Sequence, residues 1–155
     1  MTLELFNEII DFALLREHEA VQFYTDLQKM AGFAAQKQML GEMADMERGH
    51  VKMLENIRDK GLQGIKESEV ELSAVPDLKI SEYLVEAPPT EHMTYQDILV
   101  TAMKREESSF KLYTELADSF SGTEMSKVLQ RIAHEEATHK LHFEKLYDDY
   151  LLTDN

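Results

Sequence analysis

Two short motifs in the sequence place a carboxylate and an imidazole at helical spacing. They are Glu47-Arg48-Gly49-His50 and Glu136-Ala137-Thr138-His139, both of the form Glu-x-x-His. Residues three apart share one face of a helix, so each motif points its two side chains the same way. A single Glu-x-x-His arises often by chance, but two copies indicate a metal site with oxygen and nitrogen ligands.

Each motif has a glutamate 30 residues before it, Glu17 before Glu47 and Glu106 before Glu136. Both glutamates interrupt an apolar stripe with the i, i+3, i+4, i+7 spacing of a buried helix face. We therefore expect their carboxylates to be buried. The alternatives are that both lie on the surface, or that Glu19 or Glu107 takes their place, although these two residues lie off the apolar stripe.

Four buried carboxylates need compensating charge. Left unpaired, each would cost several kcal/mol or be forced to protonate. Two divalent cations balance four carboxylates, which predicts a two-metal site. Its ligands would be Glu17, Glu47, His50, Glu106, Glu136 and His139. The sequence has no cysteine, which excludes iron–sulfur clusters and thiolate zinc sites, so any metal must bind oxygen and imidazole ligands, which suit iron, manganese or zinc.

The elements that must position these ligands are predicted to be helices. All three prolines, Pro76, Pro88 and Pro89, fall in one central stretch, and the flanking halves are rich in helix-forming residues. Each half breaks once, near Gly32 and near Gly122. The prediction is one all-α domain over residues 1–155. Its helices would span about 2–31, 34–60, 94–120 and 123–150, with a long crossover at 61–93 that has room for a short helix near 80–86.

Three local signals mark the predicted helix ends. Ser121-Gly122-Thr123-Glu124 has the form of a capping box that opens the last helix. Thr94-Tyr95-Gln96-Asp97 is a weaker cap for the helix before it, and Gly61 is a helix stop after Lys60.

The two halves of the chain repeat each other. When residues 10–57 are shifted by 89 positions onto 99–146, eleven positions are identical, against roughly three expected from composition. Glu17, Glu47 and His50 fall on Glu106, Glu136 and His139. Two related helical hairpins joined by a long crossover are therefore expected to form a four-helix bundle.

The helical segments resemble the rubrerythrin family of the ferritin-like di-iron superfamily, whose ligands are one glutamate from each of two helices and Glu-x-x-His from each of the others. The matching segments are REHEAVQFYTDL, EMADMERGHVKMLENI, KREESSFKLYTEL and RIAHEEATHKLHFEKL. The resemblance covers both hairpins, about four-fifths of the chain. It implies bridging roles for Glu47 and Glu136 and terminal roles for Glu17 and Glu106. His50 and His139 would bind one iron each.

Two features depart from that family. Rubrerythrins usually carry a rubredoxin-like domain whose four cysteines deliver electrons, whereas this sequence contains no cysteine. Many also have an extra glutamate one turn after the ligand on the third helix, where this chain has Ser109. Electrons would therefore have to come from a separate donor protein.

The pattern favours a di-iron oxidoreductase that reduces peroxide or dioxygen with electrons from an external protein. Two alternatives stay open: an iron-binding, ferroxidase or storage protein, and a structural or regulatory bundle stabilised by its metals. Tyr24 and Tyr113 each lie seven residues after a ligand glutamate and so share its helix face. They are packing aromatics or, in the functional interpretation, hydrogen-bond partners of the ligand carboxylates.

Composition narrows the partners and the location. The formal net charge of −14 repels phosphate backbones, so we expect no nucleic-acid partner. No apolar run approaches the roughly 18 residues of a membrane span, and Met1-Thr2-Leu3-Glu4 lacks the basic start of a secretory signal. The expected location is the cytoplasm, and the expected assembly is a homo-oligomer, most simply a dimer.

Overall fold

The computed structural model describes residues 2–68 and 94–153, and this part of the chain contains helices and no strand. The helices are α1 (Leu3–Met30), α2 (Ala34–Lys60), α3 (Leu62–Ser68), α4 (Tyr95–Ser119) and α5 (Glu124–Thr153). The predicted all-α fold class is therefore confirmed. The short helix considered near 80–86 lies outside the described residues. None of the described helices combines the length and the apolar character needed to cross a membrane.

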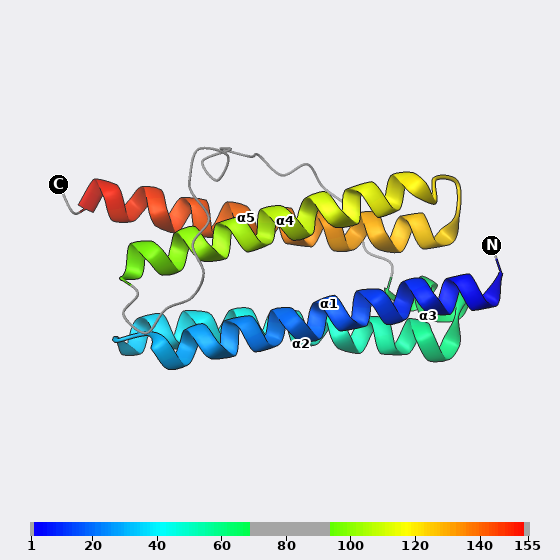
Figure 1. Cartoon of the computed structure of the whole chain (residues 1–155), viewed down its shortest axis with the longest axis horizontal. Helices are drawn as coiled ribbons and strands as arrows, with labels where there is room; N and C mark the ends of the chain where they lie inside the picture. Colours follow the sequence, from blue (N-terminus) through cyan, green and yellow to red (C-terminus); the bar gives the residue numbers. More distant parts are fainter. Residues whose placement is uncertain (1, 69–93, 154–155) are drawn as a thin grey trace. The chain divides into compact units, whose positions relative to one another are not determined.

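The chain divides into two compact units. The first contains α1, α2 and α3 together with Thr123–Met125, and the second contains α4 and α5 from Ser126 onward. Each unit is built around one helical hairpin (Figure 1).

In the first unit α1 and α2 are antiparallel neighbours. Near the turn between them, Gln28 Nε2 donates a hydrogen bond to the Lys37 carbonyl over 2.9 Å. At the other end of the hairpin, Arg58 Nε donates to Asp11 Oδ1, also over 2.9 Å. Between these contacts the helices bury apolar side chains, which include Ile10, Leu27, Leu40, Leu54 and Ile57.

The second unit repeats the register of the first. Ser126 Oγ donates to the Ala117 carbonyl over 2.8 Å, and positions 117 and 126 are those of Gln28 and Lys37 after a shift of 89 residues. At the far end Gln96 Nε2 donates to the Tyr147 hydroxyl over 3.0 Å. The repeat seen in the sequence is therefore also a repeat in how the two helices of each hairpin align.

The helix ends follow the predicted signals, with one exception. Thr94 and Asp97 form a complete capping box with both bonds at 3.1 Å, and Gly61 ends α2 with a φ of +59°. The capping box predicted for Ser121 is wrong: α5 begins only at Glu124, because Gly122 has a φ of +85° and cannot be its first helical residue. Ser121 lies in the turn before the helix.

Helix α3 was not predicted, because residues 62–68 were assigned to the crossover. It lies close to the end of α2: a Cβ on Gly64 would come within 2.7 Å of the Asn56 carbonyl oxygen and the Ile57 Cα atom. Ile65 buries its side chain in the same unit. A seven-residue helix is too short to be stable alone, so packing against α2, rather than helix propensity, explains α3.

Candidate metal centre

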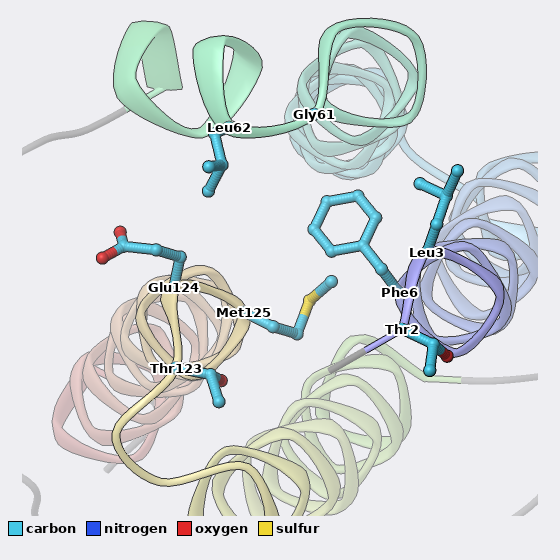
Figure 2. Close-up of a pocket in the computed structure, with 8 residues that line it drawn as sticks. All are labelled: Thr2, Leu3, Phe6, Gly61, Leu62, Thr123, Glu124 and Met125. Carbon is cyan, nitrogen blue, oxygen red and sulfur yellow. The ribbon is translucent and has the colours of Figure 1, made fainter.

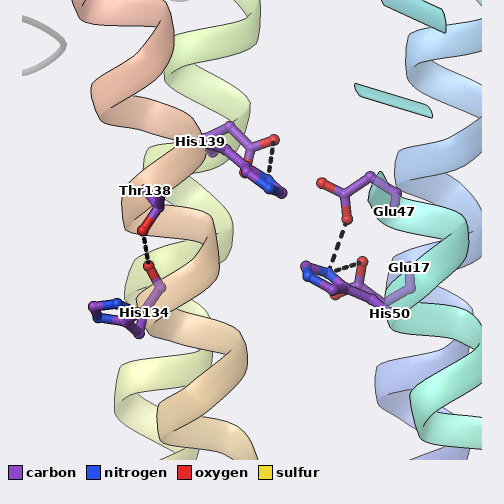
Figure 3. A network of polar contacts seen from close by, with 7 residues as sticks. Glu17, Glu47, His50, His134, Thr138 and His139 are labelled. Carbon is purple, nitrogen blue, oxygen red and sulfur yellow. Dashed lines mark hydrogen bonds and ion pairs between the residues drawn. The ribbon is translucent and has the colours of Figure 1, made fainter. Parts of the chain in front are cut away.

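The first unit brings three predicted ligands together, and we call this set the first half-site. Glu17 comes from α1, and Glu47 and His50 come from successive turns of α2. His50 Nδ1 lies 3.3 Å from Glu17 Oε2 and 3.2 Å from Glu47 Oε2 (Figure 3). All three side chains are buried, with Glu17 only 2% exposed. The prediction that Glu17 is turned into the protein, rather than to solvent, is therefore correct.

The second unit brings the equivalent residues together as a second half-site. Glu106 comes from α4, and Glu136 and His139 come from α5. His139 Nδ1 lies 3.7 Å from Glu106 Oε1. In each half-site, one ligand atom from each of the three residues lies within 4.8 Å of the other two. Both half-sites thus offer two carboxylates and one imidazole at metal-binding spacing.

The glutamates considered as alternatives lie outside the half-sites. Glu19 is exposed, and its carboxylate accepts from the Arg16 guanidinium over 3.5 Å. Glu107 is buried, but its carboxylate pairs with the ammonium groups of Lys104 and Lys111 at 3.3 and 3.5 Å. Each is therefore held by a cation of its own helix.

Burial changes the acidity of Glu17. Loss of solvent raises the pKa of this carboxyl from 4.5 to about 7, the neighbouring Glu47 adds to the rise, and the hydrogen bond from His50 opposes it. A substantial fraction of this carboxyl therefore carries a proton near pH 7, and a bound cation would replace that proton. A buried acid group of this kind is typical of a metal-binding or catalytic site.

The donor set fits hard and borderline metal ions. Carboxylate oxygens and imidazole nitrogens suit iron, manganese and zinc, and the chain has no thiolate that would select a softer ion. Two carboxylates in each half-site match the charge of one divalent cation.

A family model of the ferritin-like domain matches residues 7–148, which include all six predicted ligands. The chain belongs to the ferritin-like family. No curated protein and no solved structure matches it significantly. Family membership agrees with the all-helical structure and with the resemblance noted in the sequence. The match identifies the ferritin-like family as a whole and does not distinguish rubrerythrins within it.

In this ferritin-like chain Tyr24 and Tyr113 are almost fully buried, with 0% and 1% of their surface exposed. The ring of Tyr24 packs edge-on against Phe23 at a centroid distance of 5.1 Å. This contact agrees with a packing role. The second role, a hydrogen bond from the hydroxyl to a ligand carboxylate, stays a prediction.

Sequence reasoning missed a buried ion pair near the second half-site. Lys140 Nζ lies 3.5 Å from Glu144 Oε1, and both residues are buried. The repeat-equivalent position in the first hairpin is Val51, which carries no charge. The available signal was the spacing: Lys140 lies four residues after Glu136 and four before Glu144, on one helix face.

The ferritin-like chain also has a pocket that contains none of the predicted ligands. It lies in the first unit, where the start of α1, the end of α2 and Thr123–Met125 meet (Figure 2). Its volume is about 430 Å³, and Phe6, Leu62 and Met125 form much of its wall. The apolar lining does not suit metal binding.

The raised pKa of Glu17 predicts how the metal-free protein responds to pH. The folded pKa of about 7 lies above the ordinary 4.5, so this group stabilises the fold at low pH. The free energy of unfolding is therefore expected to fall by up to about 3 kcal/mol as pH rises from about 4.5 to about 7. Urea unfolding in the presence of a chelator should show the loss, and Glu17→Gln should flatten it. Equal slopes in both proteins would contradict the assignment.

Proposed function

We propose that the two half-sites bind metal together as one carboxylate-bridged dinuclear centre, with iron as the physiological metal. The observation that carries the proposal is the duplicated set: two carboxylates and one imidazole, buried and within 4.8 Å of each other, at repeat-equivalent positions of both hairpins. The family match over residues 7–148 supports it, because ferritin-like proteins use this ligand pattern.

The roles of the ligands follow the resemblance to rubrerythrins. Glu47 and Glu136 would bridge the two ions, Glu17 and Glu106 would be terminal ligands, and each histidine would bind one ion. Bound iron supplies electrons for cleaving an O–O bond and an open coordination position for the substrate.

The chain's own contribution is charge, proton placement and exclusion of water. In the arrangement without metal, His50 Nδ1 lies 3.3 Å from a carboxylate oxygen of Glu17 and 3.2 Å from a carboxylate oxygen of Glu47. Metal binding must displace the protons held by this cluster, so loading is expected to release protons. Burial of all six side chains keeps bulk water away from the ions.

The activity that fits these features is reduction of peroxide or dioxygen by a cytoplasmic, rubrerythrin-like oxidoreductase that receives electrons from another protein. Iron storage is the second candidate, because it uses the same ligands without a dedicated donor. A dimer is the simplest assembly for either activity.

Metal analysis of protein purified without oxygen, followed by addition of peroxide, tests the proposal. We expect two irons per chain and consumption of the added peroxide. Many irons per chain would indicate storage instead. Redox-inactive zinc without peroxide consumption would indicate that the metals only stabilise the fold.

A further inference from the structure

A buried ion pair distinguishes the surroundings of the second half-site from those of the first. Lys140 in α5 is 3% exposed, Glu144 one turn later is 0% exposed, and the Lys140 Nζ atom lies 3.5 Å from Glu144 Oε1. Lys140 directly follows the predicted ligand His139 and lies one turn after the predicted ligand Glu136. Its ammonium group is therefore a buried positive charge beside residues that would bind a positive ion.

The first hairpin shows that the repeat can pack without this ion pair. After the shift of 89 residues, the position of Lys140 is Val51, which is buried and apolar, and the position of Glu144 is Glu55, which is exposed. A buried ion pair usually gains little stability over apolar side chains of similar size, because both charges lose their hydration. Packing alone therefore does not account for the pair in α5.

Lys140 lies between two buried carboxylates on one face of α5. Glu136 precedes it by four residues, Glu144 follows it by four, and side chains four apart on a helix are neighbours with Cβ atoms about 5–6 Å apart. The Cα–Cβ bonds of a helix tilt toward its N-terminus, so the stem of Lys140 leans toward the turn that carries Glu136. The contact with Glu144 gives the ammonium group a partner that is not a predicted metal ligand.

The choice of partner matters for metal uptake. A carboxylate that pairs with an ammonium group is a poorer ligand, because the metal ion must displace that group or bind beside a second positive charge in a buried site. A carboxylate at Glu144 attracts the ammonium group and offsets its charge. The two ligand carboxylates of the second half-site can then match one divalent cation, as those of the first half-site do.

We propose that Glu144 is a positioning residue of the second half-site, which holds the Lys140 ammonium group so that Glu136 is available to a metal ion. This role rests on the proposed function, because it concerns how readily the second half-site takes up its ion. Glu144 acts through Lys140 and not as a ligand: it lies two turns after Glu136, about 12 Å farther along the helix axis.

Titration of the metal-free full chain with Co²⁺, followed by calorimetry and visible absorption, tests the positioning role. Co²⁺ binds carboxylate and imidazole ligands, and we expect the wild type to take up two ions in two steps. Glu144→Gln removes the charge that holds Lys140. It should weaken one step at least about tenfold and change the other less than about threefold. The weakened step should be the one that His139→Ala removes.

Three further variants make the result specific. Lys140→Met removes the competing ammonium group and should leave that step as tight as in the wild type or tighter. Lys140→Met/Glu144→Gln removes both charges and should restore the step to within about threefold of the wild type. Glu55→Gln is the matched control at the equivalent position of the first hairpin, and it should leave both steps unchanged. Circular dichroism of each metal-free variant checks its helices, and if Glu144→Gln does not fold, Lys140→Met still decides.

Two results would overturn the positioning role alone. They are equal Co²⁺ affinities of Glu144→Gln and the wild type, and a loss of affinity in Lys140→Met, which would show that the pair only supports the fold of the second hairpin. In both cases a wild type that binds two ions leaves the proposed function intact. A wild type that does not bind two Co²⁺ ions would contradict the proposed function, and the positioning role with it.

Discussion

Loading with ferrous iron is expected to raise the melting temperature of the protein by roughly 20 °C over the chelator-treated form. Each ion stabilises the folded state by mass action, by about 4 kcal/mol when its free concentration is a thousand times the dissociation constant. For a chain of this length, about 1 kcal/mol shifts the melting temperature by roughly 2–4 °C. The ions also relieve the repulsion among buried carboxylates, so the effect should be large in calorimetry.

Glu47→Ala separates metal binding from general stability. This substitution should lower the stability of the iron-loaded protein much more than that of the metal-free protein. In the metal-free protein the cost is smaller, because the substitution also removes a carboxylate whose burial is itself unfavourable. Glu55→Gln is the matched control, since Glu55 is an exposed glutamate on the same helix, and its melting temperature should respond to iron like that of the wild type. Identical melting with and without metal would mean that the half-sites are not metal ligands.

Reduced, iron-loaded protein is expected to consume one hydrogen peroxide per two irons and then to stop. One peroxide takes up two electrons and two protons to give two water molecules, and a pair of ferrous ions holds those two electrons. The 155 residues contain no cysteine for a second redox centre, so the electrons cannot be replaced from within this sequence. Adding rubredoxin with a reductant should restart consumption, as stopped-flow absorbance can show.

Histidine variants test which side chains support this reaction. His50→Ala should slow the single turnover at least about tenfold, because mutation of a residue that only hydrogen-bonds to a metal ligand already reduces metal affinity or activity by that factor. His18→Ala is the control, because His18 is an exposed histidine of α1, and its rate should match the wild type. Sustained consumption by the isolated chain, or none at all by the reduced iron-loaded protein, would contradict the proposed mechanism.

The sequence predicted the helices that carry the ligands, because their apolar stripes and caps are local signals. The duplicated Glu-x-x-His and the 89-residue shift also identified residues that the structure brings together within each hairpin, such as Glu17 with His50. Helix α3 was missed because it depends on the close approach of Gly64 to α2, a tertiary contact with no local pattern.

Other misses have physical reasons of the same kind. Lys140 was not singled out because lysine is rarely buried, and its burial depends on pairing with Glu144. The turn at Gly122 overrode the capping signal of Ser121, since a positive φ places the start of α5 two residues later.

X-ray absorption of the iron-loaded protein, combined with its iron content, tests most directly whether the two half-sites form one centre. The account predicts two irons per chain, nitrogen and oxygen ligands only, and an iron–iron vector of about 3.5–4 Å. Glu47→Ala, which removes a proposed bridge, should weaken that vector. Two irons per chain without any iron–iron vector would show that the half-sites bind metal separately and would contradict the dinuclear centre.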